Sequence, residues 1–100
     1  MADTYSVVLT RAAYRHLEAL RRYDRNRVLD AIRAHLAVRP TEETRNKKLL
    51  RDNPLADWEV RVQPFRVFYD VDPEAKTVRI LAVGVKERDT LIIGGQEIEI

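Results

Sequence analysis

Between residues 57 and 89, apolar and polar positions alternate, and turn residues divide the pattern into three segments. Residues 58–62 and 65–71 each repeat with a period of two, which is typical of strands that bury one face. Residues 77–85 are mostly apolar, which predicts a central strand buried on both faces. Asp72-Pro73-Glu74 favours a type I turn before this third strand.

Gln63-Pro64 predicts a two-residue connection between the first two strands. Such a connection fixes the register and places the apolar side chains of both strands on one face. The predicted apolar pairs are Val62 with Phe65, Val60 with Val67, and Trp58 with Tyr69. The opposite face then carries Arg61 directly across from Arg66, a pair of like charges that is destabilising by itself. Either both arginines are solvated on an open sheet face, or they hold an anion, for which guanidinium groups are well suited.

The N-terminal half has helical periodicity after one short apolar segment. Tyr5–Thr10 predicts a first strand, and Thr10 is a suitable N-cap for a helix over Arg11–Arg22. Asp24 is the candidate cap of a second helix that ends near Val38. The predicted buried stripes are Ala13, Leu17 and Leu20 on the first helix, and Val28, Leu29, Ile32 and Leu36 on the second. The short connection predicts an antiparallel helical hairpin lying on the sheet.

The remaining segments complete the predicted architecture. Residues 41–54 are polar and predict mostly loop, whereas Gly94-Gly95, between residues 90–93 and 96–100, favours a hairpin turn with positive φ. The element order is β-α-α-β-β-β plus a C-terminal β-hairpin. It predicts an α+β fold with helices on one face of a largely antiparallel sheet, in a single domain over residues 1–100.

Composition excludes several classes of protein. The chain has no cysteine, which rules out disulfide bonds and thiolate metal sites. It has no apolar run of membrane-spanning length, and its first residues resemble neither a signal peptide nor a transit peptide. We therefore expect a cytoplasmic protein with no membrane partner.

The net charge of +2 is unevenly distributed. Residues 11–51 contain 12 Lys and Arg against 5 Asp and Glu, a balance of +7, whereas residues 52–100 contain 6 against 10, a balance of −4. A basic helical half indicates a polyanionic partner. Solvated arginines on helix surfaces are the simpler alternative.

Few residues offer acid–base or metal chemistry. His16 and His35 fall on separate helices, and Asp72 suits the turn before Pro73 better than a metal site. No glycine-rich phosphate loop, nucleophile elbow or metal-binding spacing is present, so we expect no metal and no cofactor. RNA chemistry would have to rest on arginine and lysine. The candidate RNA-binding residues are Lys47 and Lys48 in an exposed loop, and Arg79 and Arg88 on and beyond the third strand.

Several segments together resemble the RelE/ParE superfamily of bacterial toxins from type II toxin–antitoxin systems. They are YSVVLT followed by the helical hairpin, RNKKLL, WEVRVQPFRVFYDVD and ILAVGVKERD, and the resemblance covers nearly the whole chain. It implies a RelE-like fold and a toxin neutralised by a cognate antitoxin, whose complex often represses its own operon, so that operator DNA is contacted only through that complex. RelE-like members cut messenger RNA in the ribosomal A site without metal.

The resemblance also implies roles for individual residues. Arg66 matches the family's strand arginine, which contacts the scissile phosphate. Lys86 follows Val-Gly, where the family places a basic residue, and Arg61 stands where the family often has lysine or arginine. Such groups would stabilise charge as the ribose 2′-hydroxyl attacks. The implied catalytic residues are Arg66, Arg61 and Lys86.

Two departures from the RelE pattern keep alternatives open. The RelE-type site uses a tyrosine near the C-terminus, where this chain has Leu91, Ile92 and Ile93. Glu59 stands where some members carry a basic residue that serves as general base; it could take that role or pair with a neighbouring arginine. The leading prediction is a ribosome-dependent messenger-RNA endoribonuclease that inhibits translation. The alternatives are a ParE-like poison of DNA gyrase and a catalytically weakened toxin that retains antitoxin binding.

Overall fold

The computed structural model describes residues 4–99, which form two helices and seven strands. This is the predicted α+β fold, with one strand that the sequence did not indicate, β2. In chain order the elements are β1 (Ser6–Leu9), α1 (Arg11–Glu18), α2 (Arg22–Leu36), β2 (Lys47–Leu49), β3 (Trp58–Val62), β4 (Phe65–Asp72), β5 (Thr77–Glu87), β6 (Thr90–Ile93) and β7 (Gln96–Ile98).

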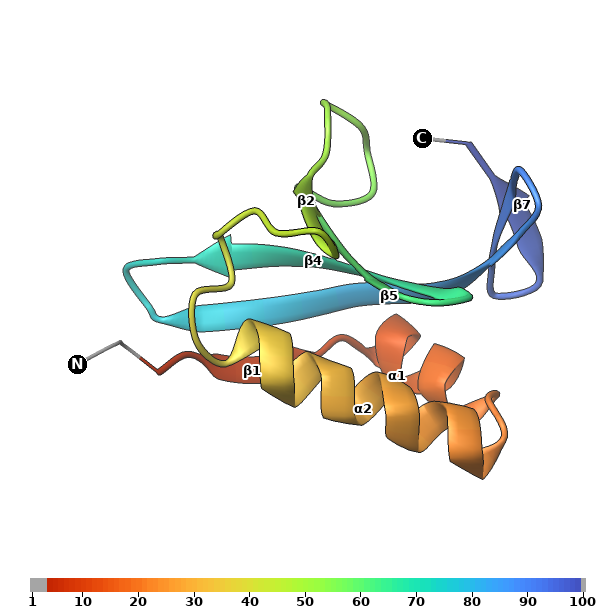
Figure 1. Cartoon of the computed structure of the whole chain (residues 1–100), viewed down its shortest axis with the longest axis horizontal. Helices are drawn as coiled ribbons and strands as arrows, with labels where there is room; N and C mark the ends of the chain where they lie inside the picture. The colour runs from red at the N-terminus through yellow and green to blue at the C-terminus, as the bar shows by residue number, and fades with distance from the viewer. Residues whose placement is uncertain (1–3, 100) are drawn as a thin grey trace.

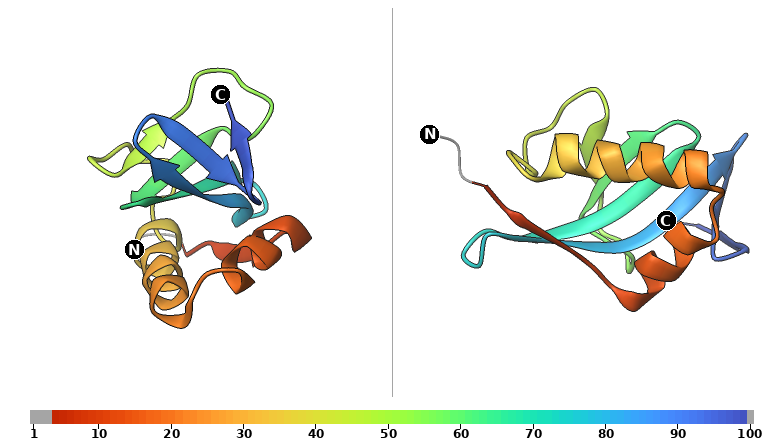
Figure 2. Two further views of the ribbon diagram at one scale, coloured as in Figure 1. Left: turned by 90° about the vertical axis from the view of Figure 1, so that its right-hand side faces the viewer. Right: turned by 90° about the horizontal axis from the view of Figure 1, so that it is seen from below.

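The strands form one sheet in the order β2-β3-β4-β5-β6-β7. These neighbours are antiparallel, and β1 pairs in parallel with the first part of β5, from Thr77 to Ile80. Both helices lie on one face of the sheet (Figure 1). The end-on view in Figure 2 shows the sheet curving away from the helices, so that the C-terminal hairpin rises on the opposite side.

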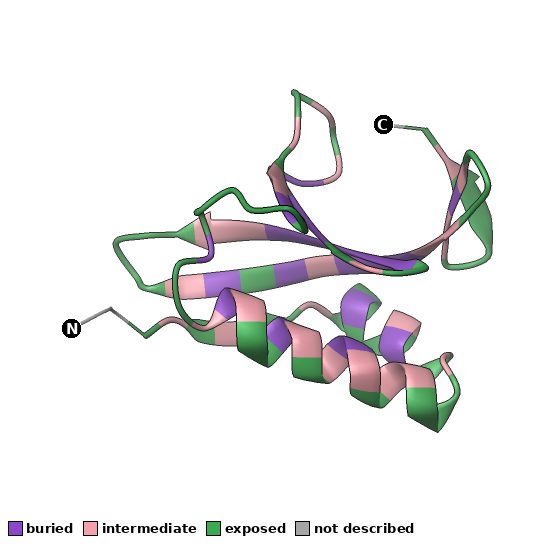
Figure 3. Cartoon of the chain, in the orientation of Figure 1, coloured by how far each residue is buried: buried purple, intermediate pink, exposed green. Residues whose placement is uncertain are grey.

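The predicted register of the first hairpin is confirmed. Residues Trp58, Val60 and Val62 pair with Tyr69, Val67 and Phe65, and Arg61 pairs with Arg66. Because side chains alternate along a strand, the apolar members all face the helices. There they pack with Val28, Ile32 and Leu36 of α2 and with Ala13 and Leu17 of α1, as the helical stripes predicted. Figure 3 shows this buried layer along β4, β5 and the inner helix faces.

A β-bulge in β5 changes which side chains face the helices. Phe68 pairs with Ala82 but Tyr69 pairs with Ile80, so Leu81 has no partner on β4. An extra residue reverses the alternation of side chains beyond it. Val78 and Ile80 before the bulge, and Val83 after it, therefore all belong to the core beneath the helices.

A second, smaller core covers the sheet face away from the helices. Its buried residues are Ala56, Phe68, Ala82 and Leu91, with Leu50, Leu55, Leu81, Ile93 and Ile98 packed around them. The β2–β3 loop and the C-terminal hairpin supply most of these side chains, and Figure 1 shows both segments on that side of the sheet. The face that was predicted to carry two arginines is therefore partly covered.

The helix boundaries differ from the prediction at the α1–α2 connection. Thr10 caps α1 as predicted, because its Oγ1 accepts the Ala13 N–H at 3.2 Å. However, α1 ends at Glu18 and α2 begins at Arg22. Asp24 lies inside the first turn of α2, and its carboxylate pairs with Arg21 at 2.9 Å, so its predicted role as the cap is wrong.

The C-terminal hairpin forms as predicted and joins the main sheet. Gly94 and Gly95 have φ values of 60° and 80°, which glycine adopts without a steric penalty. The second half of β5 pairs with β6 on one edge and with the start of β4, at Phe65 and Arg66, on the other, so only β5 separates this hairpin from Arg66.

Candidate functional site

A pocket of about 420 Å³ opens on the sheet face away from the helices. Strands β3, β4 and β5 form its floor, and the β2–β3 loop and the C-terminal hairpin form its sides. The lining residues are Leu50, Glu59, Arg66, Lys86, Asp89, Leu91, Ile98 and Glu99. The pocket thus contains two of the three predicted catalytic residues, Arg66 and Lys86, and the candidate base Glu59.

Glu59 lies between the two cross-strand arginines. Its side chain is nearly buried, with 7% of the residue exposed. One carboxylate oxygen, Oε2, is 3.2 Å from Arg61 Nε, and the other, Oε1, is 3.6 Å from Arg66 Nε. The anion that offsets the repulsion between the arginines is therefore a side chain of the protein itself. The interpretation in which both arginines are solvated on an open sheet face does not fit the structure, because only 8% of Arg66 is exposed.

Arg66 is held in place by several acceptors. Its Nη1 donates to Gln63 Oε1 at 3.3 Å and to the Phe65 carbonyl at 3.4 Å, in addition to the Glu59 ion pair. Burial lowers the pKa of Arg66, with the Glu59 carboxylate opposing and the Arg61 charge adding to the shift. A guanidinium group remains charged at neutral pH even so. Arg66 is thus a fixed positive charge on the pocket floor.

Lys86 reaches this pocket because of the bulge in β5. Its backbone N–H donates to the Pro64 carbonyl at 2.8 Å, which ties β5 to the β3–β4 turn. Lys86 is half-buried, and within residues 4–99 no hydrogen bond or ion pair engages its ammonium group. Lys86 is the more adaptable of the two pocket cations. In this pocket Arg66 and Lys86 face three carboxylates, those of Glu59, Asp89 and Glu99.

The other predicted RNA-binding residues lie at different distances from this pocket. Arg61 is at its rim, and Lys48 on β2 is the cross-strand neighbour of Glu59. Arg79 pairs in register with Asp70 at the far end of β4 and β5. Arg88 is exposed in the β5–β6 turn, with φ of 57°. The structure therefore brings Arg61 and Lys48 close to the pocket and leaves Arg79 well away from it.

The expectation of an exposed Lys47 is wrong. Only 4% of this residue is exposed. Its Nζ donates to the His35 carbonyl at 3.1 Å and to the Arg39 carbonyl at 2.8 Å, where α2 ends. The last carbonyls of a helix have no partner within the helix, and a lysine ammonium is a suitable donor for them. Lys47 therefore fastens β2 to α2, and its charge does not face solvent.

Sequence reasoning missed five of the pocket residues, which are Leu50, Asp89, Leu91, Ile98 and Glu99. Asp89 lies in a two-residue turn, and Glu99 follows the last strand, and neither position has a pattern typical of a site. The hairpin signal at Gly94-Gly95 predicted a turn but not the direction in which the hairpin bends. No sequence signal would have placed these carboxylates opposite Arg66.

Among residues 4–99, no group of three or more His, Cys, Asp or Glu side chains is arranged to hold a metal ion. In the same range, neither helix is both long and apolar enough to span a membrane.

On the helix side, α1 covers a gap in the sheet. The edge of β5 is unpaired between Ile80, where β1 ends, and Gly84, where β6 begins. Thr10 Oγ1 donates to the Leu81 carbonyl at 3.3 Å, and the Val83 N–H donates to His16 Nδ1 at 3.2 Å. These side chains satisfy the backbone groups that a neighbouring strand would otherwise bind. His16 is therefore a structural residue.

Acid is expected to weaken this contact and the fold with it. Burial lowers the pKa of His16, so the folded chain holds a proton there less readily than the unfolded chain does. The stabilising contribution is complete above the ordinary histidine pKa of about 6.5 and is lost as pH falls through the lowered value. Urea unfolding between pH 7.5 and pH 5 should show a larger loss of stability for the wild type than for His16→Leu. Parallel pH profiles would contradict this assignment.

Comparisons with known proteins identify the family of the chain. Residues 7–90 match the model of the family described as the ParE toxin of the type II toxin–antitoxin system, parDE. The comparison with curated proteins gave no match.

Two solved structures share the fold. The toxin–antitoxin complex RelBE2 from Mycobacterium tuberculosis has a chain that is 28% identical, with a TM-score of 0.73 over 84% of this chain and 93% of that one. The archaeal RelE–RelB complex from Pyrococcus horikoshii OT3 has a chain that is 23% identical, with a TM-score of 0.69 over 85% and 98%. At that identity the second likeness concerns the fold alone. The family match extends over most of the sequence, and this chain belongs to the ParE toxin family of type II toxin–antitoxin systems, within the RelE/ParE superfamily.

Proposed function

We propose that this toxin cleaves messenger RNA on the ribosome without a metal ion, with the Glu59 pocket as its active site. The observation that carries the proposal is the convergence of Glu59, Arg66 and Lys86 in one concave site. A proton acceptor beside two cations is the set of groups that RNA transesterification needs. Concave sites with a few convergent polar groups are also the usual location of catalysis.

The proposed reaction begins at the ribose 2′-hydroxyl. A Glu59 carboxylate oxygen accepts the hydroxyl proton as the 2′-oxygen forms a bond to phosphorus. Arg66 and Lys86 stabilise the negative charge that develops on the non-bridging oxygens. The bond from phosphorus to the 5′-oxygen then breaks, and this oxygen takes a proton from water. The products are a 2′,3′-cyclic phosphate and a 5′-hydroxyl end.

We further propose that a cognate antitoxin binds and neutralises this chain. The two similar structures are both described as complexes of a toxin with its antitoxin, and one of them is 28% identical to this chain.

The second candidate function is the poisoning of DNA gyrase by binding alone. It is favoured by the family description, which names ParE toxins, and by the charge of the pocket. Among the described residues that line the pocket, three carboxylates outnumber two cations, and none is a tyrosine. A pocket of this charge attracts an RNA backbone less strongly than a purely basic one.

Brief induction of the toxin, followed by mapping of messenger-RNA 5′ ends, tests the proposal. New ends at in-frame positions within translated codons are expected for the wild type. They should be absent for Arg66→Ala and unchanged for Arg33→Ala, an exposed arginine on α2 that serves as the control. Growth arrest without cuts, together with loss of gyrase supercoiling activity, would instead establish the second function. Cleavage by Arg66→Ala at the wild-type rate would remove the pocket from consideration.

A further inference from the structure

The β3–β4 turn, Gln63-Pro64, contacts α2 and both cations of the pocket. The Gln63 carbonyl accepts a hydrogen bond from Arg27 Nη2 of α2 at 2.9 Å. The Pro64 carbonyl accepts the backbone N–H of Lys86 at 2.8 Å. The side chain of Gln63 reaches Arg66, whose Nη1 donates to Gln63 Oε1 at 3.3 Å. One turn therefore holds the backbone of Lys86 and the guanidinium group of Arg66, and α2 anchors it.

The guanidinium group of Arg66 has one nitrogen left for a ligand. Its Nε lies 3.6 Å from Glu59 Oε1, and its Nη1 donates to Gln63 and to the Phe65 carbonyl. Among residues 4–99, Nη2 of Arg66 donates no hydrogen bond, and each enclosed side-chain nitrogen in that range has a partner. Nη2 is therefore not enclosed, and it opens to the pocket that Arg66 lines. It is the donor that a phosphate oxygen can reach.

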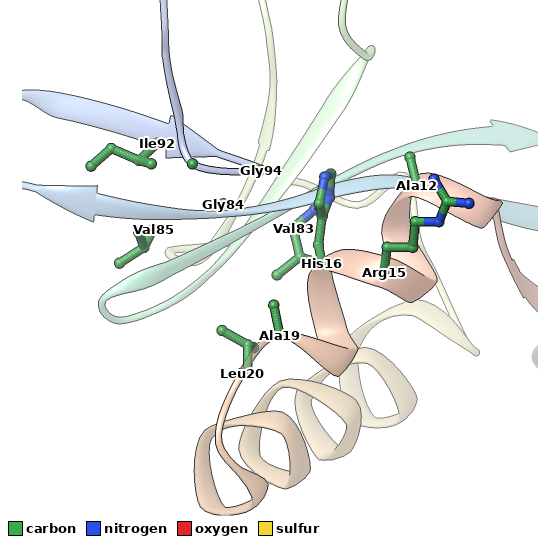
Figure 4. Close-up of a pocket in the computed structure, with 11 residues that line it drawn as sticks. Ala12, Arg15, His16, Ala19, Leu20, Val83, Gly84, Val85, Ile92 and Gly94 are labelled. Carbon is green, nitrogen blue, oxygen red and sulfur yellow. The ribbon is translucent and has the colours of Figure 1, made fainter.

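On the β5 side, Arg66 has an aliphatic neighbour. Gly84 pairs directly with Arg66, and Figure 4 shows the side chains of the adjacent Val83 and Val85 on the side of β5 that faces α1. A methyl group added to Gly84 would lie only 2.8 Å from Ile93 Cγ1, so the space beside the glycine is already filled. The side chains that orient the guanidinium group therefore come from β3 and from the β3–β4 turn.

We propose that Gln63 is a positioning residue of the active site, which fixes the plane of the Arg66 guanidinium group so that Nη2 points at the scissile phosphate. This inference rests on the proposed cleavage of RNA and adds to it a residue that does not touch the substrate. Hydrogen bonds in a catalytic site are often long before the substrate binds, as the 3.3 Å contact is, and shorten in the complex.

The proposed reaction itself gives Gln63 this role. Among residues 4–99, Glu59 is the other side chain that pairs with Arg66. Once Glu59 has accepted the 2′-hydroxyl proton, it is neutral and attracts the guanidinium group less strongly. The amide of Gln63 does not titrate, so its oxygen remains an acceptor throughout the reaction. Gln63 thus holds Arg66 in place while negative charge develops on the phosphate.

Replacing Gln63 by methionine tests the role of the acceptor. Gln63 is exposed, and the anchors of the turn are backbone carbonyls, so Gln63→Met should leave the fold intact. On ribosomes programmed with a defined message, kcat should fall about tenfold, because a hydrogen bond to a charged group is lost. KM should stay within about twofold of wild type, because the lost contact acts in the transition state. Gln96→Met, at an exposed glutamine of β7, is the matched control and should change neither constant.

A phosphorothioate at the scissile position separates misplacement of Arg66 from a loss of folded toxin. Its two diastereomers carry sulfur at one or the other non-bridging position, and sulfur is a weaker hydrogen-bond acceptor than oxygen. Because Nη2 donates to one of these positions, the wild type should cleave the two diastereomers at different rates. The ratio of these rates does not depend on the amount of folded toxin. Gln63→Met should bring it close to one, whereas Gln63→Glu, which keeps an acceptor oxygen, should retain the wild-type ratio.

The outcomes distinguish this inference from the function on which it rests. An unchanged ratio for Gln63→Met would overturn the positioning role and leave the cleavage of RNA intact, whether or not kcat falls. Equal cleavage of both diastereomers by the wild type would do the same. Absence of cleavage by the wild type would overturn the proposed function, and the role of Gln63 with it.

Discussion

Replacing Glu59 by glutamine is expected to slow RNA cleavage by about 100-fold or more and, at the same time, to tighten RNA binding. Glutamine keeps the shape of the side chain but cannot accept the proton of the 2′-hydroxyl. It also removes the negative charge that lies between Arg61 and Arg66. Both guanidinium groups then become available to phosphate oxygens, which they bind well.

The opposite signs of the two effects make this variant informative. Cleavage would be followed on ribosomes programmed with a defined message, and binding on the same ribosomes with a 2′-deoxy residue at the scissile position. Glu97→Gln, an exposed change on β7, is the matched control and should alter neither quantity. Weaker binding together with slower cleavage would mean that Glu59 only orients the arginines. Unchanged cleavage would exclude it as the base.

The arrangement of Glu59 explains why two arginines can face each other in this sheet. The pairing of Arg61 with Arg66 followed from strict alternation on both strands and from the two-residue turn between them. Period-two patterns give the register and the face of a strand, and both were predicted correctly here. Which anion lies between the arginines depends on how far Glu59 is buried, and alternation alone does not give that.

Alternation along β5 did not predict that Arg79 and Lys86 lie on the same face of the sheet. Arg79 and Lys86 are seven residues apart, so an unbroken strand would place them on opposite faces. The bulge at Leu81 brings both to the face of Arg66. No local signal at Leu81 marks this bulge, because the residues next to it, Ile80 and Ala82, are both apolar. The facing of Arg79 was therefore unpredictable from the sequence.

The second core, on the face of the sheet away from the helices, could not be predicted from the sequence pattern for a related reason. Phe68 occupies a position in β4 that alternation assigns to the face away from the helices, yet it is fully buried. Its cover comes from Leu50, Leu55 and Ile98, which are far from it in the sequence and belong to a loop and a terminal hairpin. Patterns within one element do not reveal such contacts. The pocket depends on them, because the same segments form its sides.

Replacing Lys47 by methionine is expected to destabilise the fold by about 3 kcal/mol, because hydrogen bonds to a charged group contribute about 1.5–3 kcal/mol. Methionine preserves the aliphatic stem but cannot donate to the His35 and Arg39 carbonyls. Burial lowers the pKa of Lys47, whereas the Glu42 carboxylate raises it and the Arg39 charge lowers it further. Burial of the ammonium thus costs desolvation free energy, and its two hydrogen bonds hold the end of α2 against β2.

Thermal and urea unfolding would measure this loss, and a melting temperature lower by more than about 10 °C is expected for a domain of this size. Lys48→Met is the matched control. Lys48 is more exposed than Lys47, and its side chain has no hydrogen bond among residues 4–99. The Lys48→Met substitution should therefore change the free energy of unfolding by less than about 0.5 kcal/mol. If Lys47 instead contacts RNA, as the sequence suggested, its variant would unfold like the wild type and bind RNA less tightly. The two possible roles of Lys47 therefore predict different results in unfolding and in RNA-binding assays. A buried donor predicts a loss of stability, whereas an exposed phosphate contact predicts wild-type stability and weaker RNA binding.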